Sequence, residues 1–362
     1  MSRFTNDFID EFDGYTLPSL YDSGPPDEGW LRPGDKKPDA WPGPIADRAL
    51  LIDPEAWRAA HGACAADLAR AAMAIGRLDA AVARMRTGAV TRLALIEVDA
   101  LLWAAGTPVP VDALARDLID ARAGTNLMVL QQARWAVRRL EGHGDLRDLR
   151  AFLALHRSTE TSPDPSKWTS LGLAPRLQGT DFDDAADELH QTLDALTDLH
   201  PIARGAFARQ AWALSDLSRD EGKVEGAVWS AGIMAADCSA LPFVPLGGAA
   251  RRLLHQGGPP AERLRAHCLA VLEGASAAGT LLHRLQDWSE RAETLTAHIK
   301  GDGPARIIAA LLAHPQALTS TIEIAAGTSR DTAERLLARL AGMGLVRELT
   351  GARRFRMWST AL

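Results

Sequence analysis

Apolar residues recur at helical spacing along most of this chain, beginning near Asp53. Residues three or four positions apart share one face of an α-helix, so each such run predicts a helix with one buried side. The clearest runs are Ile75, Leu78, Val82 and Met85; Leu130, Ala133, Val137 and Leu140; and Leu189, Leu193, Leu196 and Leu199. Further helices are predicted over 203–218, 226–240, 260–275 and 280–299. The pattern therefore predicts a mainly α-helical domain over residues 53–300, with a polar linker near 158–183.

The pattern changes after Pro304. A first helix is predicted over 306–312 and ends near His314, because the residue before a proline avoids helical geometry. A second helix over 321–326 ends at Gly327, a residue type that favours the position after a helix. A third helix over 329–343 is capped by Thr328 or Ser329. Its apolar residues are expected to face a small core: Ala333, Leu336, Leu337, Leu340 and Met343.

Residues 345–358 have the pattern of a β-hairpin. A first strand is predicted over 345–349, a turn over 350–352 and a second strand over 353–358. In the second strand Phe355 and Met357 alternate with Arg354 and Arg356, so one face is expected to pack and the other to meet solvent or phosphate. Three helices followed by such a hairpin are the layout of a winged helix-turn-helix, which we predict over residues 304–362.

Charge separates this C-terminal module from the rest of the chain. The module carries eight arginines and four acidic residues, a net charge of +4, whereas the whole chain carries −6. Residues 1–303 therefore carry −10. A basic module on an acidic protein indicates a nucleic acid as the partner, and combined with the winged-helix layout it indicates double-stranded DNA. The alternative is a winged helix that docks a protein.

The winged-helix layout gives each polar residue of the module an expected role. The N-terminal part of a recognition helix reaches furthest into the major groove, so we expect Ser329, Arg330 and Thr332 to lie nearest the base edges. Arg335 and Arg339 are expected to contact phosphate from the side of the helix. The wing arginines are expected on the DNA backbone or in the minor groove: Arg353, Arg354 and Arg356. One small module binds weakly alone, so a homodimer on two half-sites is expected.

Residues 1–52 are rich in proline, glycine and acidic residues, and aromatic residues are frequent among them. We expect an extended arm that wraps over the helical body or over a partner subunit. The chain begins without the basic and apolar segments of a signal peptide. Its most apolar stretch, 227–250, contains Asp237 and two prolines, so it is expected to form a buried helix and a loop. A cytoplasmic, nucleoid-associated protein is the expectation.

Motifs of common catalytic and metal sites are missing from the sequence. The chain contains no GxxxxGK[ST], HExxH or GxSxG motif, and the histidines are scattered. The cysteines Cys64, Cys238 and Cys268 lie far apart, which favours reduced, buried thiols over disulfides or zinc ligands. We expect no cofactor and no metal.

Two regions carry a resemblance to a known family. The segments 306–315 and 350–358 resemble the ending of an uncharacterised bacterial family that is common in rhizobia and their relatives. Upstream, 241–247 and 277–285 resemble the middle region of the same family. Its members join a helical domain of unknown function to a helix-turn-helix DNA-binding domain. The resemblance covers roughly 68–358 and implies the same two-part layout here.

That family is similar in layout to Fic proteins, which transfer AMP to protein hydroxyls and often carry a C-terminal winged helix. The Fic reaction needs a loop HPFxxGNGRxxR, in which the histidine acts as a base and the glycine-rich segment holds phosphates. Here His200-Pro201 begins such a segment, but Ala206-Phe207-Ala208 stands where Asn-Gly-Arg is needed. The resemblance therefore implies a degenerate Fic-like scaffold in which His200 is a helix-end residue.

Taken together, these features predict a double-stranded DNA-binding protein, a transcriptional regulator that uses helix 329–343 and wing 345–358. The chain is not expected to be an enzyme. The alternatives are a Fic-like AMP-transferase that uses His200, or an inactive Fic-like scaffold whose helical body and winged helix bind proteins.

Overall fold

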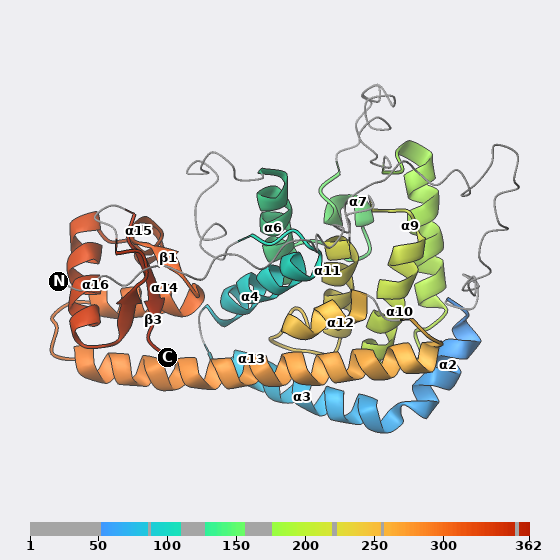
Figure 1. The fold of residues 1–362 in the computed structure, drawn as a ribbon, viewed down its shortest axis with the longest axis horizontal. Helices are drawn as coiled ribbons and strands as arrows, with labels where there is room; N and C mark the ends of the chain where they lie inside the picture. Colours follow the sequence, from blue (N-terminus) through green and yellow to red (C-terminus); the bar gives the residue numbers. More distant parts are fainter. Residues whose placement is uncertain are drawn as a thin grey trace, which may run out of the picture. The chain divides into compact units, whose positions relative to one another are not determined.

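A computed structural model describes residues 52–85, 88–109, 127–155, 176–218, 223–254, 257–351 and 355–362. This part of the chain is mainly α-helical, as the apolar pattern predicted (Figure 1). The expected N-terminal arm, most of the polar linker, and Arg353 and Arg354 lie outside the described residues. Residues Asp47–Leu362 form one compact unit, so the body and the C-terminal helices pack against each other.

The helices of the body follow in chain order. They are α2 (Pro54–Ala63), α3 (Ala65–Arg84), α4 (Ala89–Ala104), α6 (Leu127–Leu140), α7 (Leu149–Phe152), α9 (Gly179–Asp194), α10 (Pro201–Leu214), α11 (Lys223–Met234), the short 3₁₀ turn η2 (Gly247–Ala249), α12 (Ala250–Leu254) and α13 (Pro260–Thr296). The predicted apolar runs form their buried faces: Leu78 and Val82 on α3, and Leu130 and Leu140 on α6, are all at least 95% buried.

Helix α13 corrects one prediction. The pattern predicted two helices, 260–275 and 280–299, but residues Pro260–Thr296 form one continuous helix. Small residues separate the two apolar runs, and Gly279 lowers local helix propensity. The helix continues because α3 packs alongside it and Ala275 and Ala278 are buried in this stretch (Figure 1). Tertiary packing outweighs the local preference of a single glycine.

The polar linker also ends earlier than predicted. Helix α9 begins at Gly179, inside the range 158–183 that the composition assigned to the linker. Asp181 lies in the first turn of α9, where its charge favours the helix N-terminus. Asp181 was therefore assigned to the linker, although it lies at the start of a helix in which the following residue, Phe182, is buried.

The C-terminal module contains α14 (Gly303–Ala313), β1 (Ala317–Leu318), α15 (Thr319–Ala326), α16 (Arg330–Gly342), β2 (Val346–Glu348) and β3 (Met357–Thr360). The three helices occur where the sequence predicted them. The strands form an antiparallel sheet in the order β1-β3-β2. Strand β1 was not predicted, because two residues are too short for a periodic signal. It pairs Ala317 with Trp358, which joins α14 and α15 to the hairpin.

Local chemistry explains the helix ends in the module. His314 has an extended backbone conformation before Pro315 and ends α14. Gly327, with a φ of 56°, follows α15 in the left-handed conformation that glycine adopts without strain. Ser329 caps α16, because its side chain accepts a hydrogen bond from the Thr332 N–H.

The hairpin differs from the prediction at Phe355. Phe355 was expected to pack beside Met357, but its φ is 59° and it is 62% exposed, whereas Met357 is buried. Strand β3 begins only at Met357, so Phe355 belongs to the turn and the alternation of a strand does not apply to it.

The apolar stretch 227–250 forms most of the buried helix α11 and the loop and turn that follow it. None of the described helices combines the length and apolar character needed to cross a bilayer. Cys64 and Cys268 are buried, Cys238 is half-buried, and all three are free thiols.

Candidate nucleic-acid interface

Helix α16 has one buried and one exposed face. Ala333, Leu336, Leu337 and Leu340 are buried, and Met343 is half-buried, as predicted. The exposed residues of the helix are Arg330, Asp331, Glu334, Arg335, Ala338, Arg339 and Gly342. Three arginines therefore share the solvent-facing side of a helix whose other side is fixed in the core.

The three arginines differ in their partners. Arg330 Nε donates a hydrogen bond to Glu334 Oε1 at 3.1 Å, and the two side chains are 66% and 47% exposed. Arg339 Nη2 lies 2.6 Å from His298 Nε2, just beyond the end of α13. Arg335 is exposed and makes no hydrogen bond or ion pair within the described part of the chain. Exposed pairs of this kind contribute little energy, so a competing anion can replace them.

The N-terminal end of α16 is held against the preceding helices. Thr332 lies half-buried beside the capping Ser329, and Ser329 Oγ donates to Thr332 Oγ1 at 2.9 Å. Arg306 of α14 donates to the Gly327 carbonyl at 3.2 Å and forms an ion pair with Asp302. The turn between α15 and α16 is thereby tied to α14, and Ser329 and Arg330 are presented from a fixed backbone.

The β2–β3 hairpin, which follows α16 in the sequence, also carries exposed arginines. Arg347 on β2 and Arg356, just before β3, are both exposed. In the turn, Thr350 donates two hydrogen bonds to Glu348, from its N–H and its hydroxyl. These bonds lower the pKa of Glu348. Of the predicted wing contacts, only Arg356 falls within the described residues.

The helical body binds the C-terminal module through a side chain that the sequence pattern did not indicate. Arg92 of α4 is buried and donates hydrogen bonds to the carbonyl oxygens of Leu311 at 3.0 Å and His314 at 2.9 Å. Its other amino group donates to Thr360 Oγ1 on β3 at 3.2 Å. One side chain therefore caps the end of α14 and holds the sheet. Burial lowers the pKa of Arg92 to about 10.

Two further contacts complete this joint. A Cβ at Gly88, which has a φ of 81°, would lie 2.7 Å from the Ala313 backbone, so only glycine allows α4 to begin this close to α14. The Trp288 indole of α13 donates to the Leu345 carbonyl at 2.7 Å in the interior. The only sequence signal for the joint was a lone arginine on the apolar helix α4.

The segment that begins with His200 forms a helix. His200 caps α10, since its Nδ1 accepts a hydrogen bond from the Ile202 N–H at 3.1 Å, and Pro201 occupies the first turn. Ala206, Phe207 and Ala208 lie inside α10 and are buried. Their backbone N–H groups lie in the helix interior, where they meet carbonyls of the preceding turn instead of forming an anion-binding loop. Burial lowers the pKa of His200.

A second buried polar cluster lies deeper in the body. The Glu97 carboxylate accepts hydrogen bonds from the N–H groups of Leu246 at 3.0 Å and Gly247 at 2.7 Å, and so fixes the loop after α11. Burial raises the pKa of Glu97, and the hydrogen bonds from the two N–H groups, followed by the charge of Arg209, offset part of that shift. His267 lies in the same interior, 3.1 Å from Met234 Sδ. Burial, and secondarily Arg209, lowers the pKa of His267 to about 3.

A metal site is not evident in the described ranges, where no group of three or more His, Cys, Asp or Glu side chains converges. No protein-family model and no curated protein matches the chain. The solved structures to which it is similar include that of a Fic family protein from Desulfovibrio desulfuricans G20. The TM-score is 0.36 and the sequence identity 16%, over 80% of this chain and 95% of the other. This similarity carries no functional assignment.

Proposed function

We propose that the module 304–362 is a winged helix-turn-helix that binds double-stranded DNA, and that the protein is a transcriptional regulator. The observation that carries the proposal is the exposed arginine face of α16, fixed by a buried apolar face and followed by an arginine-bearing hairpin. Its Arg330–Glu334 pair is exposed and lies within one helix, so phosphate can displace the carboxylate at small cost. A nucleoid-associated location in the cytoplasm belongs to the same proposal.

In the proposed complex the start of α16 enters the major groove. Ser329, Arg330 and Thr332 lie nearest the base edges, and Arg335 and Arg339 contact phosphate along the flank. The hairpin arginines contact the backbone or the minor groove: Arg353, Arg354 and Arg356. Phosphate contacts supply most of the affinity, and base contacts supply the sequence preference.

Selection of bound duplexes from a random-sequence library tests this proposal directly. The full chain is expected to enrich one motif, and Arg330→Ala is expected to relax the preference at one position of that motif. Arg354→Ala and Arg356→Ala together are expected to weaken binding to all duplexes and to reduce the salt slope by roughly one unit per lost contact. Arg138→Ala, an exposed arginine of α6, is the matched control. No enrichment, with affinity unchanged in every variant, would rule out DNA binding.

Dimerisation is the second part of the proposal. A single module of this charge binds weakly, and two modules on one duplex raise the affinity through their linkage. Sedimentation of the full chain with and without the selected duplex is expected to detect a dimer. A monomer under both conditions would remove this part while leaving DNA binding intact.

We further propose that the chain does not carry out Fic-type AMP transfer. Two observations support this: His200 Nδ1 is engaged in capping α10, and Ala206, Phe207 and Ala208 are buried within that helix. Incubation with labelled ATP and a cell lysate is expected to label no protein. Labelling that disappears in His200→Ala would restore the enzyme as the better hypothesis.

A further inference from the structure

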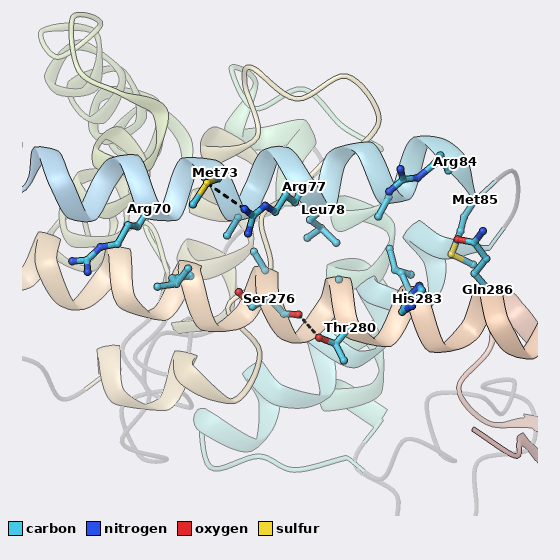
Figure 2. Close-up of a pocket in the computed structure, with 16 residues that line it drawn as sticks. Arg70, Met73, Arg77, Leu78, Arg84, Met85, Ser276, Thr280, His283 and Gln286 are labelled. Atoms are coloured by element: carbon cyan, nitrogen blue, oxygen red, sulfur yellow. Dashed lines mark hydrogen bonds between the residues drawn. The ribbon is translucent and has the colours of Figure 1, made fainter.

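A groove runs between α3 and α13, far in the sequence from the predicted DNA-contacting residues (Figure 2). Its volume is about 470 Å³. The α3 wall carries Arg70, Met73, Arg77 and Arg84, and the α13 wall carries uncharged polar residues together with His283. No aspartate or glutamate is among the described residues that line it.

The three arginines of the groove follow a regular spacing. Arg70, Arg77 and Arg84 are seven residues apart, which is close to two helical turns, so they line one side of α3. At a rise of about 1.5 Å per residue, neighbouring arginines in the row are separated by roughly 10 Å along the helix axis. All three side chains are exposed.

The charge of this row is only partly compensated. Arg70 pairs with Asp67 on the same helix. Arg77 Nη2 donates to Met73 Sδ at 3.5 Å, and neither Arg77 nor Arg84 forms an ion pair within the described residues. On the opposite wall, His283 lies 3.8 Å from Asp287, and both side chains are largely exposed. Two of the three arginines therefore lack an acidic partner in the part of the chain that the structure describes, and their uncompensated charge favours an anionic ligand.

The floor of the groove is made of small and apolar side chains. Ala74, Leu78, Ala275 and Leu282 are buried at its base, and Met73 at the rim is 53% exposed. Small residues allow a partner backbone to approach closely, and Met73 offers an adaptable apolar contact. Among the described residues that line the groove there is no Phe, Tyr or Trp to stack on nucleotide bases, which disfavours a single-stranded nucleic acid.

We propose that this groove binds an acidic amphipathic helix of a protein partner. A helix laid between α3 and α13 would place its apolar face on the floor, and acidic residues seven positions apart would meet the arginine row in register. A second copy of this face would bring arginine against arginine, so self-association through the groove is disfavoured. The site is separate from the proposed DNA contacts.

A labelled peptide pair tests the proposal on the full chain. The first peptide is an amphipathic helix of about three heptads with a glutamate at every seventh position, and the second has glutamine in those positions. Fluorescence anisotropy at low salt is expected to give the glutamate peptide about tenfold tighter binding. That difference should shrink as salt rises, because exposed ion pairs are screened.

Charge reversal sharpens the test. Arg77→Glu with Arg84→Glu is expected to abolish the preference for glutamate and to favour a lysine-bearing peptide, while Arg138→Glu on α6 changes nothing. Both replaced residues are exposed, and an unchanged circular dichroism melt verifies that the variant is folded. Equal binding of the two peptides, no saturable binding, or an unaffected double variant would overturn the proposal. Loss of DNA binding in the double variant, without peptide binding, would assign the groove to nucleic acid instead.

Discussion

Arg92 and Arg335 are the same residue type in two regions that use it in opposite ways. Arg92 is 3% exposed under the C-terminal module and donates to carbonyl groups of α14 and a hydroxyl of β3. Arg335 lies exposed on α16 with no partner among the described residues. Removing the hydrogen-bond partners of a buried arginine destabilises the folded state, so the bonds of Arg92 stabilise the fold and are not available to a ligand. An exposed arginine stays hydrated until an anion arrives, so Arg335 remains available for a ligand.

The same contrast applies to histidines of the long helix α13. His267 is 3% exposed and contacts Met234, whereas His283 lines the open groove. Residue type thus gives little information on role in this protein. The surroundings decide whether a polar side chain holds the fold together or meets a partner, and the following substitutions probe that difference.

Arg92→Ala is expected to have the largest effect. It leaves the carbonyls of Leu311 and His314 without their donor in the interior and opens a cavity at the joint, at a cost of about 3 kcal/mol in the free energy of unfolding. Urea denaturation followed by circular dichroism measures it. Arg138→Ala, exposed on α6, is the control and should change stability by less than about 0.5 kcal/mol. An effect as small for Arg92→Ala would remove the distinction between the two regions.

His267→Met is expected to change the pH dependence of stability. The pKa of His267 is lowered from 6.5 to about 3 in the folded chain. Below pH 6.5 this histidine is therefore protonated in the unfolded chain but stays neutral in the folded chain. The contribution of neutral His267 to the free energy of unfolding is complete above pH 6.5 and is lost as the pH falls toward 3. Between pH 6.5 and 5, the variant should lose about 2 kcal/mol less stability than the native chain. Parallel curves for the native chain and for His267→Met would contradict the buried, neutral state of His267.

Arg335→Ala is expected to affect binding without affecting folding. The side chain is exposed, so the free energy of unfolding should change by less than about 0.5 kcal/mol. Loss of one phosphate contact should weaken binding to the selected duplex by about tenfold at low salt, and comparably on unrelated duplexes. Electrophoretic mobility shifts over a salt series measure this. Full affinity in this variant would exclude Arg335 from the interface.

Glu334→Gln is expected to give the smallest effect. It breaks the Arg330–Glu334 pair and removes a negative charge from the proposed DNA-facing side. Stability should fall by about 0.3 kcal/mol, the usual scale for such a pair on a helix surface. Affinity for the duplex should rise about twofold to threefold, because Arg330 is released and repulsion decreases. Weaker binding would mean that Glu334 itself contributes a contact to the DNA.

The sequence determined the local features of the C-terminal module. Periodic apolar residues predicted α14, α15 and α16, a proline and a glycine predicted where the first two end, and Ser329 was among the predicted caps. These features depend on neighbours within a few positions, which is the range over which sequence patterns carry information. The exposure of Arg330, Arg335 and Arg339 followed from the same period, since the apolar residues occupy the other face.

Only the tertiary structure decided the rest. The continuity of α13 and the two-residue strand β1 each depend on a partner distant in the sequence. The burial of Arg92 depends on α14 and β3, which lie more than two hundred residues further along the chain. The groove likewise exists because α3 packs on α13. Residue periodicity determines which side of a helix is apolar. Which other segment covers that side depends on packing between parts of the chain that are far apart in the sequence, and local patterns carry no information on it.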